Sequence, residues 1–356
     1  MNDITSPNWF ILSLLSGFAT FALIVVLIPL AKCVGLLDMP DAVRKRHSHP
    51  VPMVGGLAIY ISVASTVLIA DVPDGVLLLV LTTGILVFIG LLDDLRGLGV
   101  RTRLAIQMVC TLVVIAESGV SIRSVGLDEV DMYFNFASVG LLATVFSVVG
   151  LTNAFNMVDG IDGLALGHAL IALLGIILAI YITRAETGEI AWLIILVMPM
   201  GVAFLVNISV TPVKRVFLGD AGSLMLGFLL AWILIFVTQE PLSMLHPVSA
   251  LWFVAVPVYD TLIVIFRRLN ERKSPFRPDR KHLHHLLVDI GLNPNVVLFA
   301  ILFMSFSLNG IGLWLLHSLS PFVSFIAFIG FFMLFAYAVF HPMIVKRVLN
   351  RFDGRS

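Results

Sequence analysis

Long apolar runs separated by short polar segments repeat along the whole chain. Most of the uncharged runs are about 17–21 residues long, which is enough for a helix to cross the hydrocarbon core of a bilayer. A membrane barrel would instead alternate polar and apolar residues, and an isolated strand cannot satisfy its backbone in lipid. The pattern therefore predicts an all-α polytopic membrane protein with eleven transmembrane helices, at 9–30, 54–70, 76–92, 104–118, 137–156, 164–183, 190–207, 222–239, 248–266, 296–316 and 322–342.

The composition agrees with this pattern. The chain has 356 residues, of which 59% are hydrophobic and 12% are charged, whereas soluble domains average about 45–50% apolar and about 25% charged residues. A soluble globule is excluded. The 22 Lys and Arg residues balance the 22 Asp and Glu residues, so no net charge favours nucleic acid as a partner. Residues 1–356 are predicted to form a single transmembrane domain.

The basic residues fall almost entirely on one side of the predicted membrane. With the amino terminus placed outside, 20 of the 22 Lys and Arg residues lie in inside segments, and such an excess is typical of cytoplasmic loops. Only Arg123 and Arg184 lie outside. We therefore predict an outside amino terminus and an inside carboxyl terminus. The inside residues are Lys32, Arg44, Lys45, Arg46, Arg96, Arg101, Arg103, Lys214, Arg215, Arg267, Arg268, Arg272, Lys273, Arg277, Arg280, Lys281, Lys346, Arg347, Arg351 and Arg355.

The weakest predicted span is 104–118, whose uncharged stretch from Leu104 to Ala116 has only 13 residues. If it failed to cross, the basic loop 267–295 would move outside unless 137–156 also failed. The two spans are therefore expected to cross together or not at all.

Polar residues that interrupt the apolar pattern gather in the inside loops. Asp93 and Asp94 are adjacent where a predicted helix leaves the membrane. They can be a solvated helix end beside Arg96. Alternatively, two carboxylates that repel each other near the carboxyl end of a helix dipole would be relieved by a bound cation. The pair alone leaves both interpretations open.

The inside segment from Asn153 to Gly163 carries no Lys or Arg. Asn156, Asp159 and Asp162 are spaced by three residues, which would bring them near one face of a helix. The glycines within the segment allow close backbone approach. An oxygen-rich, glycine-rich loop indicates the edge of a site that binds a nucleotide or Mg²⁺. The alternative is a capped turn between two helices.

The segment Phe217 to Ser223 reads F-L-G-D-A-G-S and places Asp220 just before an apolar run. Asp220 can act as an ordinary N-cap. A helix amino terminus flanked by glycines also suits phosphate, and a carboxylate there is a hard ligand for Mg²⁺. Capping and metal binding can coexist.

The inside loop 267–295 combines seven Lys or Arg residues with His282, His284 and His285. Zinc is one interpretation of the histidines, but no cysteine lies near and the flanking positive charge disfavours a cation. Arg and His donors beside carboxylates on other loops instead match a diphosphate substrate whose metal needs oxygen ligands. We therefore expect this loop to recognise phosphate.

Asp260 lies inside a predicted span, in the sequence V-P-V-Y-D-T-L. An ionisable residue within a span is a functional hypothesis by default. Pairing with Arg267, about two helical turns further along, is the plainer alternative. The sequence does not decide between them.

Taken together, these motifs make the sequence resemble the polyprenyl-phosphate N-acetylhexosamine-1-phosphate transferases over almost its whole length. The motifs R-K-R-H with V-P-M-V-G-G, L-D-D, N-A-F-N-M-V-D-G-I-D-G, F-L-G-D-A-G-S and S-P-F-R-P-D-R-K-H-L-H-H occur in the family's order. Each motif is weak by itself, but the set is specific. The reading H-L-H-H, where the branch that handles muramoyl-pentapeptide has three consecutive histidines, favours the N-acetylglucosamine branch.

The resemblance implies the catalytic and metal-binding residues. Asp220 corresponds to the aspartate that holds magnesium. Asp93 and Asp94 correspond to the acidic pair beside the lipid phosphate, with Asp93 as a base and Asp94 as an orienting or metal-proximal group. The catalytic-loop histidines correspond to His282, His284 and His285.

The resemblance also implies the substrate-binding residues. Phe217 occupies the aromatic position that stacks on uracil, and the loop around Arg280 contacts the donor's diphosphate and sugar. The nucleoside and phosphate side of the donor corresponds to Asn156, Asp159 and Asp162. The remaining members of the substrate-binding set are Lys45, Arg46, His47 and Arg277.

The implied reaction transfers N-acetylglucosamine 1-phosphate from UDP-N-acetylglucosamine to undecaprenyl phosphate. The products are the lipid diphosphate sugar and UMP, and the cofactor is Mg²⁺, or Mn²⁺ in its place. In this family the step begins O-antigen or enterobacterial common antigen synthesis, in the bacterial inner membrane with the active site on the cytoplasmic face. The alternatives are another UDP-N-acetylhexosamine donor and, in a different class, a proton-coupled transporter.

Overall fold

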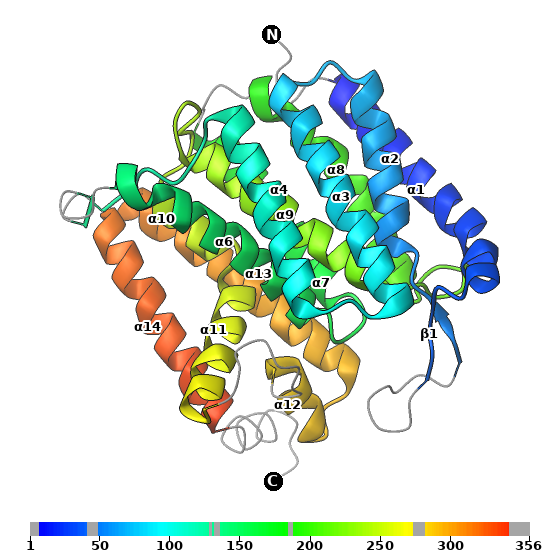
Figure 1. Ribbon diagram of the computed structural model, residues 1–356. Helices are drawn as coiled ribbons and strands as arrows, with labels where there is room; N and C mark the ends of the chain where they lie inside the picture. Colours follow the sequence, from blue (N-terminus) through cyan, green and yellow to red (C-terminus); the bar gives the residue numbers. More distant parts are fainter. Residues whose placement is uncertain are drawn as a thin grey trace.

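The computed structural model describes residues 7–40, 49–127, 130–131, 136–183, 188–272 and 282–341. Long helices pass back and forth between two ends of the molecule, and a short hairpin extends from one end (Figure 1). The helices are α1 (Pro7–Val34), α2 (Gly55–Ile69), α3 (Asp74–Arg96), α4 (Val100–Ser118), α6 (Phe136–Val158), α7 (Leu164–Thr183), η1 (Gly188–Leu193), α8 (Ile194–Asn207), α9 (Gly219–Thr238), α10 (Pro247–Phe253), α11 (Ala255–Asn270), α12 (Leu283–Asp289), α13 (Pro294–Ser318) and α14 (Pro321–Phe340).

The prediction of an all-α polytopic membrane protein is confirmed. Within the described ranges, the strands are the two-residue pair β1 (Leu37–Asp38) and β2 (Val51–Pro52), which are antiparallel and place Leu37 opposite Pro52. Eight described helices are long and apolar enough to cross a membrane, or nine if α10 and α11 form one broken span. Each predicted span coincides with one helix or with two consecutive helices, but α2 has only 15 residues and α4 is not among the eight. The number eleven and the orientation stay predictions.

The span predicted at 248–266 differs from the structure, because it is not one straight helix. The axes of α10 and α11 meet at 80°, with the break at Val254. Pro257 explains the break. Proline has no N–H to donate to the carbonyl of Phe253, and its ring clashes with that carbonyl in a continuous helix. A further helix, α12, follows within the basic loop.

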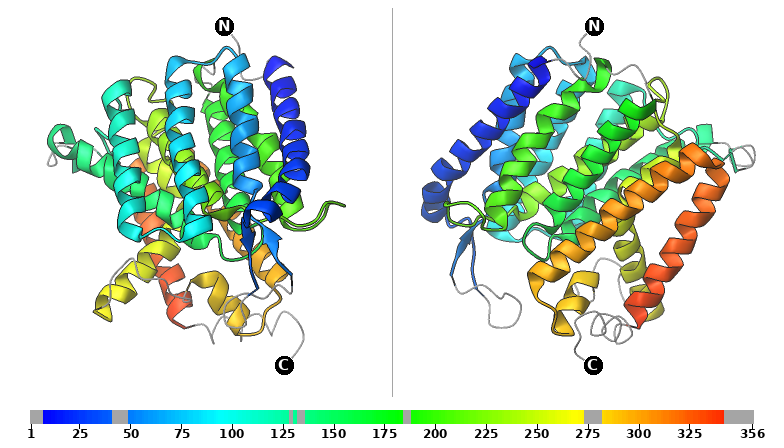
Figure 2. Two further views of the ribbon diagram at one scale, coloured as in Figure 1. Left: turned by 45° about the vertical axis from the view of Figure 1, so that its right-hand side comes forward. Right: turned by 180° about the vertical axis from the view of Figure 1, so that it is seen from behind.

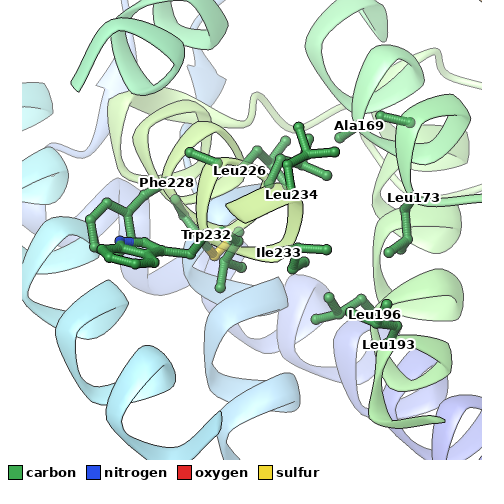
Figure 3. Close-up of a cluster of buried hydrophobic side chains, with 14 of the residues drawn as sticks. Ala169, Leu173, Leu193, Leu196, Leu226, Phe228, Trp232, Ile233 and Leu234 are labelled. Atoms are coloured by element: carbon green, nitrogen blue, oxygen red, sulfur yellow. The ribbon is translucent and has the colours of Figure 1, made fainter. Parts of the chain in front are cut away.

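Helix α9 forms the centre of the bundle. Nearly all its residues are buried, and it packs against α2, α3, α6 and α7. Figure 3 shows Phe228, Trp232 and Leu234 projecting from α9, with Ala169 and Leu173 on the neighbouring α7. Lipid is as apolar as leucine, so close packing rather than the hydrophobic effect holds such helices together.

Glycines bring two helices very close to the amino terminus of α9. A Cβ atom on Gly56 of α2 would lie 2.3 Å from the Cα of Gly222, and one on Gly90 of α3 would lie 2.3 Å from the Cα of Ala221. A larger residue at either position would push its helix away. The glycines in V-G-G and G-D-A-G therefore serve close helix packing.

The turns that carry the sequence motifs lie at one end of the molecule. In Figures 1 and 2 the β1–β2 hairpin, the turn between α3 and α4, the turn between α6 and α7, and α12 are all at the lower end. Helix α1 begins at the upper end, whereas α14 ends at the lower one. The bundle thus gathers loops that are distant in sequence onto a single face.

Candidate active site

The carboxylate of Asp94 caps the amino terminus of α9 from a different helix. Its two oxygens accept hydrogen bonds from the backbone N–H of Asp220 at 3.0 Å and from that of Ala221 at 3.4 Å. The N-cap role considered for Asp220 is therefore wrong. Helix α9 begins at Gly219, which has a left-handed φ of 72°, and Asp220 lies in the first turn with its side chain directed elsewhere.

Asp93, Asp94 and Asp220 form an acidic cluster, in which Arg103 contacts Asp93 and Asp220. Its guanidinium lies 2.5 Å from Asp93 Oδ2 and 3.3 Å from Asp220 Oδ2. Asp93 also accepts a hydrogen bond of 2.6 Å from the N–H of Leu98, which closes the turn into α4. From the sequence, Arg103 is expected only to mark the inside of the membrane. Arg103 lies in the first turn of α4, the helix that follows Asp93, and this short separation in sequence could have predicted the pairing with Asp93.

The amide of Asn156 reaches the same cluster from α6. It donates to Asp220 Oδ1 at 2.7 Å and to Ser223 Oγ at 3.0 Å. The three residues would share a face only if the segment were helical, but α6 ends at Val158, and Asp159 and Asp162 lie in a turn between two helices, which was the alternative. Asn156, in the last turn of α6, and the two aspartates in the turn after it still lie at the same end of the bundle.

The turn that contains Asp159 has an unusual electrostatic environment. Burial and the negative charges of Asp220, Asp94 and Asp162 raise the pKa of Asp159 to about 8. Asp162 forms an ion pair with Arg215, which lies on the segment leading into α9. An added cation would lower the electrostatic repulsion among these carboxylates.

Asn207, at the end of α8, holds two of the motif segments together. Its side-chain oxygen accepts from the N–H of Gly163, and its amide donates to the carbonyl of Val216 at 2.8 Å. A buried side-chain amide whose polar groups are all hydrogen-bonded holds the backbone around it in one conformation. Sequence reasoning missed Asn207, because nothing near it along the chain indicated a partner nine residues later.

Phe217 lies two residues before the start of α9, and its backbone is bonded to β2 and to the first residue of α2. Its N–H donates to the carbonyl of Pro52 at 2.8 Å, and its carbonyl accepts from Gly55 at 2.9 Å. Its side chain is half-buried. The motifs V-P-M-V-G-G and F-L-G-D-A-G-S are therefore hydrogen-bonded to each other. Phe217 precedes Gly219 by two residues in the second motif.

Two of the three histidines, His284 and His285, lie on α12, and His282 is the residue before it. His284 is buried, and a Cβ atom on Gly160 would lie 2.0 Å from its Nε2, so its ring rests directly on the turn after Asp159. Burial and the neighbouring histidines lower the pKa of His284 well below its usual value. The rings of His282 and His284 are nearly parallel, with centroids 5.8 Å apart, and those of His284 and His285 are 4.1 Å apart.

Asp260 contacts the start of the histidine segment, which we define as residues 282–285. Its Oδ2 lies 2.7 Å from Nδ1 of His282, and its Oδ1 accepts the N–H of Leu283 at 2.8 Å. This partner differs from Arg267, which the sequence suggested as the plainer alternative. Five of the predicted substrate-binding residues lie outside the described residues, namely Lys45, Arg46, His47, Arg277 and Arg280.

The acidic cluster fits a hard divalent cation. In the part of the chain that the structure describes, no three His, Cys, Asp or Glu side chains form a ready-made metal site. Mg²⁺ does not require one, since it commonly binds one or two carboxylates, water and substrate phosphates. The side chain of Asp220 is 34% exposed, and the carboxylates of Asp93 and Asp94 lie close enough to affect its ionisation. Asp220 is thus accessible in an oxygen-rich, negatively charged setting.

Comparison with known proteins gives the same family as the motifs. A family model described as glycosyl transferase family 4 matches residues 76–238, which include the acidic cluster and α9. A protein of Escherichia coli strain K12 is 33% identical over 330 residues, covering 91% of this chain and 89% of its own length. Relatives from Haemophilus influenzae (32% identical, covering 96% of this chain and 98% of their own) and Yersinia pestis (32%, 90% and 89%) are similar. All three are named undecaprenyl-phosphate alpha-N-acetylglucosaminyl 1-phosphate transferase. Since identity at this level extends over nine-tenths of the chain, the protein belongs to glycosyl transferase family 4, the polyprenyl-phosphate sugar-phosphate transferases.

Proposed function

We propose that this enzyme transfers N-acetylglucosamine 1-phosphate from UDP-N-acetylglucosamine to undecaprenyl phosphate. The observation that carries the proposal is the meeting of Asp94, Asn156 and Asp220 within hydrogen-bond distance, at one end of an apolar bundle. A lipid acceptor reaches this place from the membrane and a nucleotide sugar from water. The names of the relatives agree with both substrates.

In the proposed reaction an oxygen of the lipid phosphate attacks the β-phosphorus of the donor. The bond from that phosphorus to the bridging oxygen breaks, and UMP leaves with the bridging oxygen. The products are undecaprenyl-diphosphate N-acetylglucosamine and UMP. A phosphate monoester has its second pKa at about 6, so the attacking group is largely dianionic at neutral pH and needs little help from a base.

The chain's carboxylates position the reactants. Asp220 would hold Mg²⁺, or Mn²⁺, and the bound ion would neutralise charge on the donor's diphosphate. Asp94 is an orienting group because it fixes the first turn of α9, on which Asp220 lies. Asp93 is the candidate base, and its contact with Arg103 gives the cluster a nearby positive charge. Positioning and electrostatic stabilisation would supply most of the rate enhancement.

The donor would lie across the turn after α6 and the segment before α9. Asn156, Asp159 and Asp162 would face its nucleoside and phosphate side, and Phe217 would stack on uracil. His282, His284 and His285 are proposed as catalytic residues at the diphosphate. Further phosphate contacts are proposed for Lys45, Arg46, His47, Arg277 and Arg280.

We place this site on the cytoplasmic face of the bacterial inner membrane, where UDP-sugars are available. The support is the distribution of Lys and Arg, which puts the motif loops inside, the amino terminus in the periplasm and the carboxyl terminus in the cytoplasm. Synthesis of O-antigen or enterobacterial common antigen would follow this step.

The transporter alternative has one structural feature in its favour, the broken pair α10–α11 beside Asp260. Carriers often build ion sites at such breaks. Here, however, both oxygens of Asp260 bind the histidine segment, and the acidic motifs lie in end loops rather than within the spans. Transport therefore explains less of the site than phosphosugar transfer does.

A donor panel on washed membranes tests the proposal. Membranes that contain the enzyme should convert labelled UDP-N-acetylglucosamine to an organic-extractable lipid, and an Asp220→Asn variant should not. Conversion of a different UDP-N-acetylhexosamine instead would reassign the donor. No lipid-linked product from any donor would refute the enzymatic proposal.

A further inference from the structure

A buried carboxylate on α11 binds the segment 282–285, which carries the three histidines. Asp260 lies in the second turn of α11 and is 2% exposed. One oxygen contacts His282 Nδ1 at 2.7 Å, and the other accepts the N–H of Leu283 at 2.8 Å. Leu283 is the first residue of α12, so Asp260 satisfies a backbone donor that the helix itself leaves unpaired.

We infer that Asp260 is a positioning residue that sets the ring orientation and tautomer of His282 and anchors α12 against the turn after Asp159. The inference rests on the proposed function. A carboxylate can only accept, so the hydrogen of a neutral His282 ring must be on Nδ1, which leaves Nε2 as an acceptor. Carboxylates that bind the far nitrogen of a functional histidine commonly have this effect.

The contacts continue from Asp260 to the donor-binding turn. The ring of His282 is nearly parallel to that of His284, and His284 in turn lies against Gly160. A small rotation of His282 would therefore be transmitted to the turn that holds Asp159. Asp260 of α11 and Leu283 of α12 therefore join the two helices directly.

A purely structural role explains these contacts less well. A buried carboxylate is expensive unless it is paired, and an apolar residue of similar size is often neutral or stabilising in its place. Both oxygens of Asp260 instead contact the histidine segment, one at His282 and the other at Leu283. The 80° break at Val254 directs α11 toward α12, so the fold and the carboxylate serve the same contact.

A double-mutant cycle in the full-length enzyme tests the inference. Asp260→Asn retains an oxygen for Leu283 but presents an NH₂ group to His282, which forces the other tautomer. We expect kcat to fall by about 10- to 100-fold, with little change in KM for UDP-N-acetylglucosamine. In a His282→Ala background the same change should have almost no further effect, because Asp260 acts through His282.

Asp131→Asn is the matched control. Asp131 also accepts backbone N–H groups, from Val125 at 2.9 Å and Gly126 at 3.1 Å. Through Ser124 it is linked to Gln239 at the carboxyl end of α9, whereas the acidic cluster lies at the amino end of that helix. Asp131→Asn should lower the melting temperature without lowering kcat. If His282→Ala has no measurable turnover, the ¹⁵N shifts of His282 in the folded protein carry the test, and Asp260→Asn should move them to the other tautomer.

Two results would overturn the inference. One is a fully additive cycle, in which Asp260→Asn lowers kcat equally with and without His282. The other is an unchanged His282 tautomer in a folded Asp260→Asn variant. If the proposed function is wrong, the wild-type enzyme makes no lipid-linked sugar. If only this inference is wrong, the wild-type enzyme is active, but the effects of Asp260→Asn and His282→Ala on kcat are independent of each other.

Discussion

Gly90→Ala tests how closely α3 must approach α9 for the site to work. The added Cβ would lie 2.3 Å from the Cα of Ala221, 2.4 Å from its N and 2.7 Å from the carbonyl carbon of Asp220. All three are backbone atoms, so no flexible side chain can move aside. The two helices must separate.

The size of that movement follows from the same distances. Ordinary van der Waals contact begins near 3.4 Å, so the helices must part by about 1 Å. Asp94 is one helical turn beyond Gly90 on the same helix. Its bonds to the N–H of Asp220 and Ala221, at 3.0 and 3.4 Å, would then exceed hydrogen-bond distance. A misplacement of about 1 Å can lower a rate by about 10²-fold, and overpacking destabilises by about 1–3 kcal/mol.

The assay is UMP release by purified enzyme, with a thermal melt in the same detergent. Gly150→Ala is the control, because Gly150 is a helical glycine of α6 whose added Cβ would meet nothing within 4 Å. Gly90→Ala should lose about 10²-fold in kcat while the control keeps wild-type activity. Wild-type kcat in Gly90→Ala would refute the idea that this close approach positions Asp94.

Three further changes examine single residues. Asp220→Asn removes the charge that would hold the metal, so transfer should fall by about 10³-fold or more, and activity near wild type at saturating Mg²⁺ would contradict the assignment. Phe217→Leu should raise KM for the UDP-sugar by about tenfold, since stacking on a base is worth about 1–3 kcal/mol; an unaltered KM would assign the ring to packing. Because the pKa of Asp159 rises from 3.8 to about 8 in the fold, ionising it opposes folding, and the melting temperature in EDTA should fall as pH increases between these values. Asp159→Asn should flatten that decline, and equal slopes in the two proteins would exclude this cause.

The helices and the convergence of the motif loops could be predicted from the sequence. Apolar runs locate the helices because a span must be long and uncharged to be stable in lipid. Charge asymmetry grouped the loops on one side, and the structure does bring Asp94, Asn156, Asp220 and His284 to one end. These are properties of short segments, and each segment carries its own signal.

The partners of individual side chains could not be predicted in this way. Asp94 caps a helix that begins 125 residues later, Asp220 does not cap its own helix, and Asp260 pairs with His282 rather than Arg267. Such pairings depend on which helices become neighbours, which hydropathy does not report. The bend at Val254 is different, because Pro257 was a local signal for it that the span prediction passed over.

The most direct test of the account follows the phosphorus that moves. Purified enzyme would receive UDP-N-acetylglucosamine labelled at its β-phosphorus, together with undecaprenyl phosphate and Mg²⁺. Attack at that phosphorus predicts one UMP for each lipid-linked sugar formed, with all the transferred label in the lipid and none in UMP. Formation of UDP, or label retained in the nucleotide product, would mean that the sugar moves without its phosphate and would contradict the proposed reaction.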